Sequence, residues 1–99
     1  MTSQLAESNY RMPDGQTLQH ISKLAIANDK PIMLDYWVTS VEKKVIIGVR
    51  VGGEKLLVKN EDEYTSPISK VYKVKEDFII ETENSLYLVS AAIETKKIS

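Results

Sequence analysis

The first amphipathic segment of the chain has the spacing of an α-helix. Four apolar residues recur at intervals of three and four positions: Leu18, Ile21, Leu24 and Ala25. A turn signal at 13–15 precedes them, and Asp14 or Thr17 can cap the first helical turn. Pro31 cannot continue a helix because its ring removes a backbone donor. The pattern predicts one helix over about 16–28.

From Pro31 onward the pattern changes to short runs of β-branched and aromatic residues separated by polar turns. The predicted strands are 32–38, 45–51, 55–59, 68–75, 78–82 and 85–90. Gly52 and Gly53 favour a tight hairpin, since glycine adopts the positive φ that primed turns require. The segment 60–67 reads as a polar loop, and 91–99 is weakly patterned.

The predicted strands suggest one shared buried face. Pairing 32–38 with 45–51 sets Tyr36 opposite Ile47 and matches apolar residues throughout. A two-residue turn at Gly52-Gly53 then pairs Ile47 with Val58 on the same face. The predicted core face comprises Ile32, Leu34, Tyr36, Val38, Val45, Ile47, Val49, Leu56 and Val58.

The last predicted hairpin is apolar on both faces. A two-residue turn at 83–84 pairs Ile80 with Tyr87 and Phe78 with Val89. The other face carries Ile79, Leu86 and Leu88. A strand that is apolar on both faces is usually covered on both, so we expect the helix or a second protomer to pack there.

Together these elements predict an α+β fold: an N-terminal helix followed by about six antiparallel strands that form a small meander barrel or roll. The expected organisation is a flexible tail over 1–12 and a single domain over 13–99.

Composition narrows the functional classes. The chain has 99 residues, 42% of them hydrophobic, and a formal net charge of −1, which fits one soluble globular domain and argues against a general polyanion binder. No apolar run is long enough to cross a membrane, and the first nine residues lack the features of a signal peptide. The absence of cysteine fits a reducing cytoplasm, and we expect an intracellular protein. The strong excess of lysine over arginine is common in AT-rich genomes, including those of viruses and phages.

The sequence offers little for catalysis. His20, the single histidine, lies in the predicted helix, and the chain has no cysteine nucleophile. The acidic run at 60–63 lacks the spacing of a calcium loop, so we interpret it as a solvated loop. Gly52 and Gly53 lie between strands and do not form a phosphate loop. We therefore expect no enzymatic activity, no cofactor and no metal site.

One predicted sheet face carries the candidate binding residues. The register above places Asp35 opposite Gly48, next to Trp37 and diagonal to Arg50, with Lys55 and Lys59 on the next strand. An aromatic ring beside several cations suits stacking on a base while neutralising a phosphate. The alternative is that Trp37 marks the surface where the helix packs, or a protein interface.

Two functional hypotheses follow. The first is a small non-enzymatic protein that acts by protein–protein association, including self-association into a homo-oligomer, because its apolar positions exceed what one short helix covers. The second is a binder of a small anionic ligand, such as a nucleotide, or of single-stranded nucleic acid through Asp35, Trp37, Arg50, Lys55 and Lys59. No membrane partner is expected.

Overall fold

The computed structural model describes residues 11–98, which form two helices and eight strands in two mixed sheets. Helix α2 spans Gly15–Asn28 and α3 spans Trp37–Val41. The strands are β1 Ile32–Met33, β2 Ile46–Val49, β3 Lys55–Asn60, β4 Glu63–Tyr64, β5 Ile68–Val74, β6 Asp77–Thr82, β7 Leu86–Ser90 and β8 Glu94–Lys97. The α+β class is confirmed, but the two sheets do not close into a barrel. Most of the predicted tail at 1–12 lies outside the described residues.

The predicted helix is confirmed. The Asp14 side chain accepts a hydrogen bond from the Gln16 backbone N–H at 2.8 Å and so caps the first turn of α2. Asp29 adopts a left-handed conformation with φ 55° and ends the helix shortly before Pro31. Ile21 is buried on the face that packs against a sheet, and Leu24 lies beside it.

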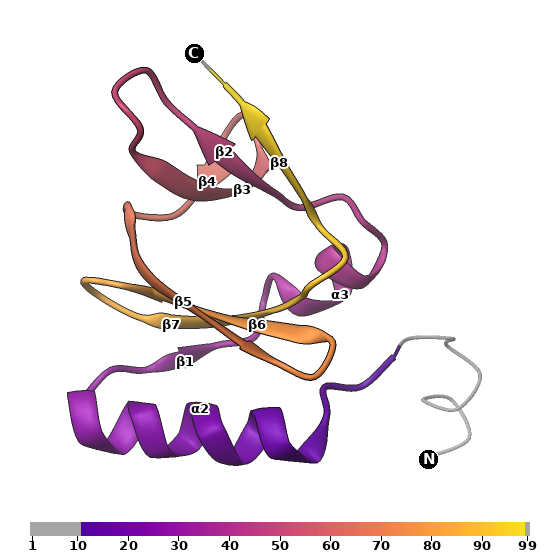
Figure 1. Cartoon of the computed structure of the whole chain (residues 1–99), viewed down its shortest axis with the longest axis vertical. Helices are drawn as coiled ribbons and strands as arrows, with labels where there is room; N and C mark the ends of the chain where they lie inside the picture. The colour runs from indigo at the N-terminus through magenta and orange to yellow at the C-terminus, as the bar shows by residue number, and fades with distance from the viewer. Residues whose placement is uncertain (1–10, 99) are drawn as a thin grey trace.

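That sheet, called sheet A here, has the strand order β1-β7-β6-β5 and is the middle layer of the fold (Figure 1). The predicted β6–β7 hairpin is confirmed, since Phe78 pairs with Val89 and Ile80 with Tyr87. Ile79, Leu86 and Leu88 pack with Ile21 of α2. Of the two expected covers for this face, the helix and a second protomer, it is the helix α2 that packs on it.

The second sheet, called sheet B, has the order β4-β3-β2-β8 and packs on the other face of sheet A. Ile47 and Leu57 of sheet B form one core cluster with Ile80 and Val89 of sheet A. The molecule is thus layered as α2, sheet A and sheet B, with apolar side chains between the layers.

The predicted hairpin between 32–38 and 45–51 is wrong. β1 has only two residues and pairs in parallel with β7, while β2 pairs with β3 and β8. The residues from Trp37 to Val41 form α3 instead of a strand. Trp37 and Val41 are four positions apart, so a helical turn places both on one face, where they pack in the same cluster as Ile21. Two residues of the predicted core face are consequently exposed, Leu34 at 58% and Val38 at 37%.

The glycine hairpin forms with a register one residue away from the prediction. Ile47 pairs with Leu57 and Gly48 with Leu56, because the Arg50 N–H bonds the Glu54 carbonyl at 2.8 Å and leaves a three-residue loop. Both loop glycines have φ near +95° (97° and 95°). The one-residue difference turns Leu57 inward with Ile47 and places Leu56 on the outer face of the sheet.

Two strands are absent from the sequence prediction. β4 forms inside the segment that reads as a polar loop, after a turn in which the Asn60 side chain accepts hydrogen bonds from the backbone N–H groups of Asp62 and Glu63. β8 forms in the weakly patterned C-terminal segment and pairs in parallel with β2. These additions and the two parallel pairs replace the predicted antiparallel meander.

Candidate functional site

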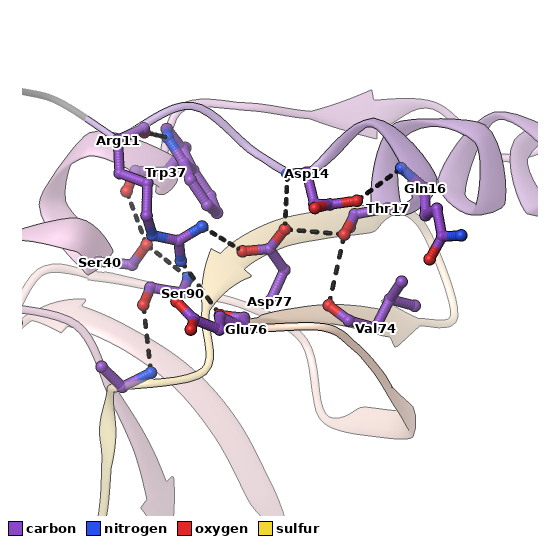
Figure 2. A network of polar contacts seen from close by, with 11 residues as sticks. Arg11, Asp14, Gln16, Thr17, Trp37, Ser40, Val74, Glu76, Asp77 and Ser90 are labelled. Atoms are coloured by element: carbon purple, nitrogen blue, oxygen red, sulfur yellow. Dashed lines mark hydrogen bonds and ion pairs between the residues drawn. The ribbon is translucent and has the colours of Figure 1, made fainter.

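A network of polar contacts is centred on the carboxylate of Asp77, at the start of β6 (Figure 2). It is fully buried and accepts hydrogen bonds from Arg11 Nη1 at 2.7 Å, the Asp14 backbone N–H at 2.9 Å and Thr17 Oγ1 at 2.7 Å. Burial by itself raises the pKa of Asp77, but these hydrogen bonds and the Arg11 charge outweigh burial and hold the pKa below its usual value. The carboxylate therefore ties residues 11–17 to sheet A.

Trp37 belongs to the same network. Its indole Nε1 donates to the Arg11 carbonyl at 2.8 Å, and the Arg11 guanidinium lies 4.9 Å from the centre of its ring. The Ser40 hydroxyl donates to the Trp37 carbonyl and accepts from the Ser90 backbone N–H, as Figure 2 shows. Trp37 is 6% exposed and packs between α2 and sheet A, so its contacts are those of a core residue.

A second polar cluster lies around Glu81 of β6. Its carboxylate accepts from Lys30 Nζ at 2.8 Å, Asn28 Nδ2 at 3.1 Å and the Tyr72 hydroxyl at 3.2 Å. The Lys30 ammonium is the main reason that the pKa of Glu81 is lowered, and its effect exceeds that of burial. The cluster fastens the C-terminal end of α2 to sheet A, and its hydrogen bonds are internal to the fold.

The five predicted site residues are divided between two parts of the molecule. Trp37 lies in the cluster between α2 and sheet A, whereas Arg50, Lys55 and Lys59 belong to sheet B and its hairpin. Lys59 Nζ donates to the Asp35 carbonyl at 3.1 Å and lies 5.2 Å from the centre of the Tyr36 ring. The structure thus brings Asp35 and Lys59 together, but the predicted face joining Trp37 to Arg50 is wrong because β1 and β2 do not pair.

Arg50 instead lies on the rim of a groove on the outer face of sheet B, and Lys59 also lines this groove although its ammonium contacts Asp35 and Tyr36. This groove, called the sheet B groove here, has a volume of about 560 Å³. It is lined by Lys44, Ile46, Arg50, Leu56, Val58, Lys59, Asn60, Glu61, Tyr64 and Ile98. Aliphatic side chains form its floor, and its charged groups stand at the rim.

The geometry of the groove follows from the observed register. Ile46 pairs with Val58 and Gly48 with Leu56, which places these residues on the face opposite Ile47 and Leu57. Because glycine has no side chain, position 48 leaves a depression in that face. Ile98, just beyond β8, lies across it, and its N–H donates to the Val49 carbonyl at 3.0 Å.

Two residues that line the groove are not predicted from the sequence. Tyr64 is 54% exposed and pairs with Val58, although the polar residues around it indicate a loop. Ile98 is 39% exposed and lies in a segment without alternation, so no local pattern marks it. The one sequence feature that points to Ile98 is Gly48, because a glycine within a strand leaves a space that an apolar side chain from another strand can fill.

Within residues 11–98 no cluster of His, Asp or Glu is arranged to hold a metal ion. Among the described helices none is long and apolar enough to cross a membrane. Comparisons of this chain with protein-family models, curated proteins and solved structures find no match.

Proposed function

We propose that this protein is a non-enzymatic binding module that associates with another protein through the sheet B groove. The observation that carries the proposal is the difference between the two sheets. Sheet A is covered by α2 on one face and by sheet B on the other, whereas the outer face of sheet B leaves Tyr64 and Ile98 partly exposed beside Ile46 and Val58. A contiguous exposed apolar surface with a polar rim is typical of protein interaction sites.

The form of the groove favours a protein over a small molecule. Small-molecule sites are usually enclosed and have polar groups that converge on the ligand. Here the polar side chains stand at the rim, and every buried side-chain nitrogen and oxygen among the described residues already has a hydrogen-bond partner. The lining also has no histidine or cysteine, and its single carboxylate is Glu61, which supports a binding role over acid–base catalysis.

A peptide selection tests this proposal with no assumption about the sequence of the partner. A random-peptide phage library is selected on the wild-type protein, and enriched peptides are then measured on Val58→Glu and on Val71→Glu. Val58 lines the groove and Val71 is an exposed valine of β5, so the second variant is a matched control. We expect peptides that bind the wild type and Val71→Glu but lose affinity for Val58→Glu. Peptides that bind all three proteins equally, or no enrichment, would contradict the proposal.

Self-association is the homotypic form of the same proposal. The apolar face around Leu88 does not support it, because α2 covers that face, so the sheet B groove is the surface to test. The mass in solution is measured over a range of concentrations for the wild type and for Tyr64→Ala. A mass that rises with concentration only in the wild type would identify a second copy as the partner. A mass that rises equally in both would place self-association on a different surface.

The alternative function is binding of a nucleotide or another small anion. It is favoured by the presence of the cations Lys44 and Arg50 on one groove with the exposed Tyr64 ring, although Trp37 does not take part. Titration with ATP and with a short oligothymidylate, followed by the amide shifts of groove residues, tests this function separately. Shifts confined to the groove that disappear in Arg50→Gln would favour it over protein association.

A further inference from the structure

We infer that the segment bound by the sheet B groove is an extended peptide with an acidic residue at each end and apolar residues between them. This inference rests on the proposed function and specifies the chemistry of the partner. It is carried by the charge of the rim, the position of each charge along the strands, and the apolar floor.

The rim has an excess of positive charge. Lys44, Arg50 and Lys59 line the groove, and Glu61 is the acidic residue among the lining side chains. Arg50 pairs with Glu54 at 3.1 Å, but both side chains are nearly half exposed, so this pair is weak and can exchange its partner. The Lys59 ammonium contacts the Asp35 carbonyl and the Tyr36 ring, which belongs to the cluster between the sheets, so Lys44 and Arg50 are the cations left to meet a partner in the groove. An anionic partner therefore matches the rim.

The cations stand at opposite ends of the groove. β2 and β3 are antiparallel, with Ile46 opposite Val58, so Lys44 lies at the same end as Lys59. Arg50 lies at the other end, where the hairpin turns. Lys44 and Arg50 are six positions apart along the chain, which corresponds to about 20 Å of extended backbone. Two carboxylates at this separation would each meet a cation.

Between these ends the floor is apolar. Ile46, Val58 and Ile98 lie between the charged positions, and the Tyr64 ring borders them. In an extended peptide, alternate side chains point to the same side, so residues i, i+2, i+4 and i+6 would face the groove. The pattern that fits is acidic at i and i+6 and apolar at i+2 and i+4. In a helix the residues i and i+6 are only about 9 Å apart along the axis, so their carboxylates would not reach both ends of the groove.

The probe that tests this inference is the capped peptide Glu-Thr-Ile-Thr-Val-Thr-Glu. Two matched peptides accompany it: the neutral Gln-Thr-Ile-Thr-Val-Thr-Gln, and Thr-Glu-Ile-Thr-Val-Glu-Thr, which keeps the charge but moves both acids to the other side of the extended chain. Each is titrated into the full chain at low salt while the amide shifts are followed. We expect the first peptide to bind about tenfold more tightly than either control and to lose this advantage at high salt.

Variants of the protein show which of its cations contact the carboxylates of the peptide. Arg50→Gln and Lys44→Gln should each reduce the advantage of the acidic peptide over the neutral one, because each removes one of its expected partners. Lys23→Gln, which changes an exposed lysine on α2, should leave that advantage unchanged. All three substitutions are at surface or rim positions, and the amide spectrum of each free variant shows whether the fold is intact.

The outcomes separate this inference from the function on which it rests. If all three peptides bind equally and Val58→Glu abolishes binding, the groove binds peptides but the acidic pattern is wrong. If the first peptide binds better but Val58→Glu has no effect, its site is elsewhere and the inference fails. An oligothymidylate that displaces the peptide and binds more tightly would show that the rim serves nucleic acid, and would also overturn the inference. Failure of all peptides rejects this pattern, while the library selection still tests the proposed function.

Discussion

The side chain of Ile98 fills the space above Gly48. A β-carbon at position 48 would lie 2.8 Å from Ile98 Cδ1 and 3.0 Å from Val58 Cγ2, closer than carbon atoms normally approach. The depression left by the missing side chain is therefore occupied by a residue fifty positions further along the chain. This contact joins the end of β8 to the outer face of sheet B, where Ile98 also lines the groove.

Gly48→Ala should therefore destabilise the protein, because the new methyl group must displace both Ile98 and Val58. We expect a loss of about 1–3 kcal/mol in the free energy of unfolding, measured by urea denaturation. Ile98→Ala in the same chain should recover part of this loss by making room for the methyl group. Additive effects of the two substitutions would show that the residues do not share this contact.

Ile47→Ala tests the packing of sheet B on sheet A. Ile47 is buried between the sheets with Leu57 and Val89, so removing three of its carbon atoms should cost about 2–5 kcal/mol in the free energy of unfolding. Val51→Ala is the control, because Val51 is exposed in the hairpin loop and its truncation should cost almost nothing. Equal costs for the two substitutions would contradict the placement of Ile47 between the sheets.

The sequence predicts some pairings well because more than one feature supports each of them. In the last hairpin, the two-residue turn at 83–84 and the apolar residues on both faces permit one register, and Ile80 pairs with Tyr87 as expected. The helix is equally determined, by its spacing and by Asp14 and Pro31 at its ends. In both cases the decisive contacts lie within about fifteen residues of one another.

Other features depend on contacts that local patterns do not encode. The segment around Trp37 fits a strand by composition and a helical turn by the spacing of Trp37 and Val41, and packing against sheet A decides between them. The Gly52-Gly53 pair permits a loop of two or of three residues. Arg50 and Lys59 stand out in the sequence by their charge, but the groove that joins them depends on this loop and on Ile98.

Asp77→Asn tests the network that anchors Arg11 and Thr17. Loss of the charge weakens the ion pair with Arg11 at a fully buried site, and we expect a cost of about 1–3 kcal/mol at neutral pH. The lowered pKa of Asp77 also sets the sign of the pH dependence: its contribution is present above the unfolded-state pKa near 3.8 and is lost as the pH falls further. Urea denaturation at pH 7 and at successively lower pH should show a smaller acid dependence for Asp77→Asn than for the wild type.

Tyr36 provides the corresponding prediction at alkaline pH. Burial, followed by the neighbouring Tyr87 and Asp35, raises the pKa of Tyr36 from 10.0 to about 12. The folded protein therefore favours the neutral phenol, and this contribution is complete below pH 10 and is lost as the pH rises from 10 through about 12. Tyr36→Phe should reduce the loss of stability over this interval. An unchanged alkaline profile would show that the Tyr36 phenol ionises as readily in the folded chain as in the unfolded one.

The fluorescence of Trp37 distinguishes the observed core position from the binding face that the sequence suggests. Trp37 is the single tryptophan of the chain, is 6% exposed, and lies beneath the Arg11 guanidinium. Its emission should therefore be blue-shifted, weakly quenched by acrylamide, and unchanged by ATP or oligothymidylate, even at concentrations that shift the amides of the sheet B groove. Arg11→Ala removes the cation over the ring and should increase acrylamide quenching, whereas Arg50→Ala, on the other sheet, should not. Emission that responds to nucleotides and loses this response in Arg50→Ala would place the two residues at one site and contradict the observed strand pairing.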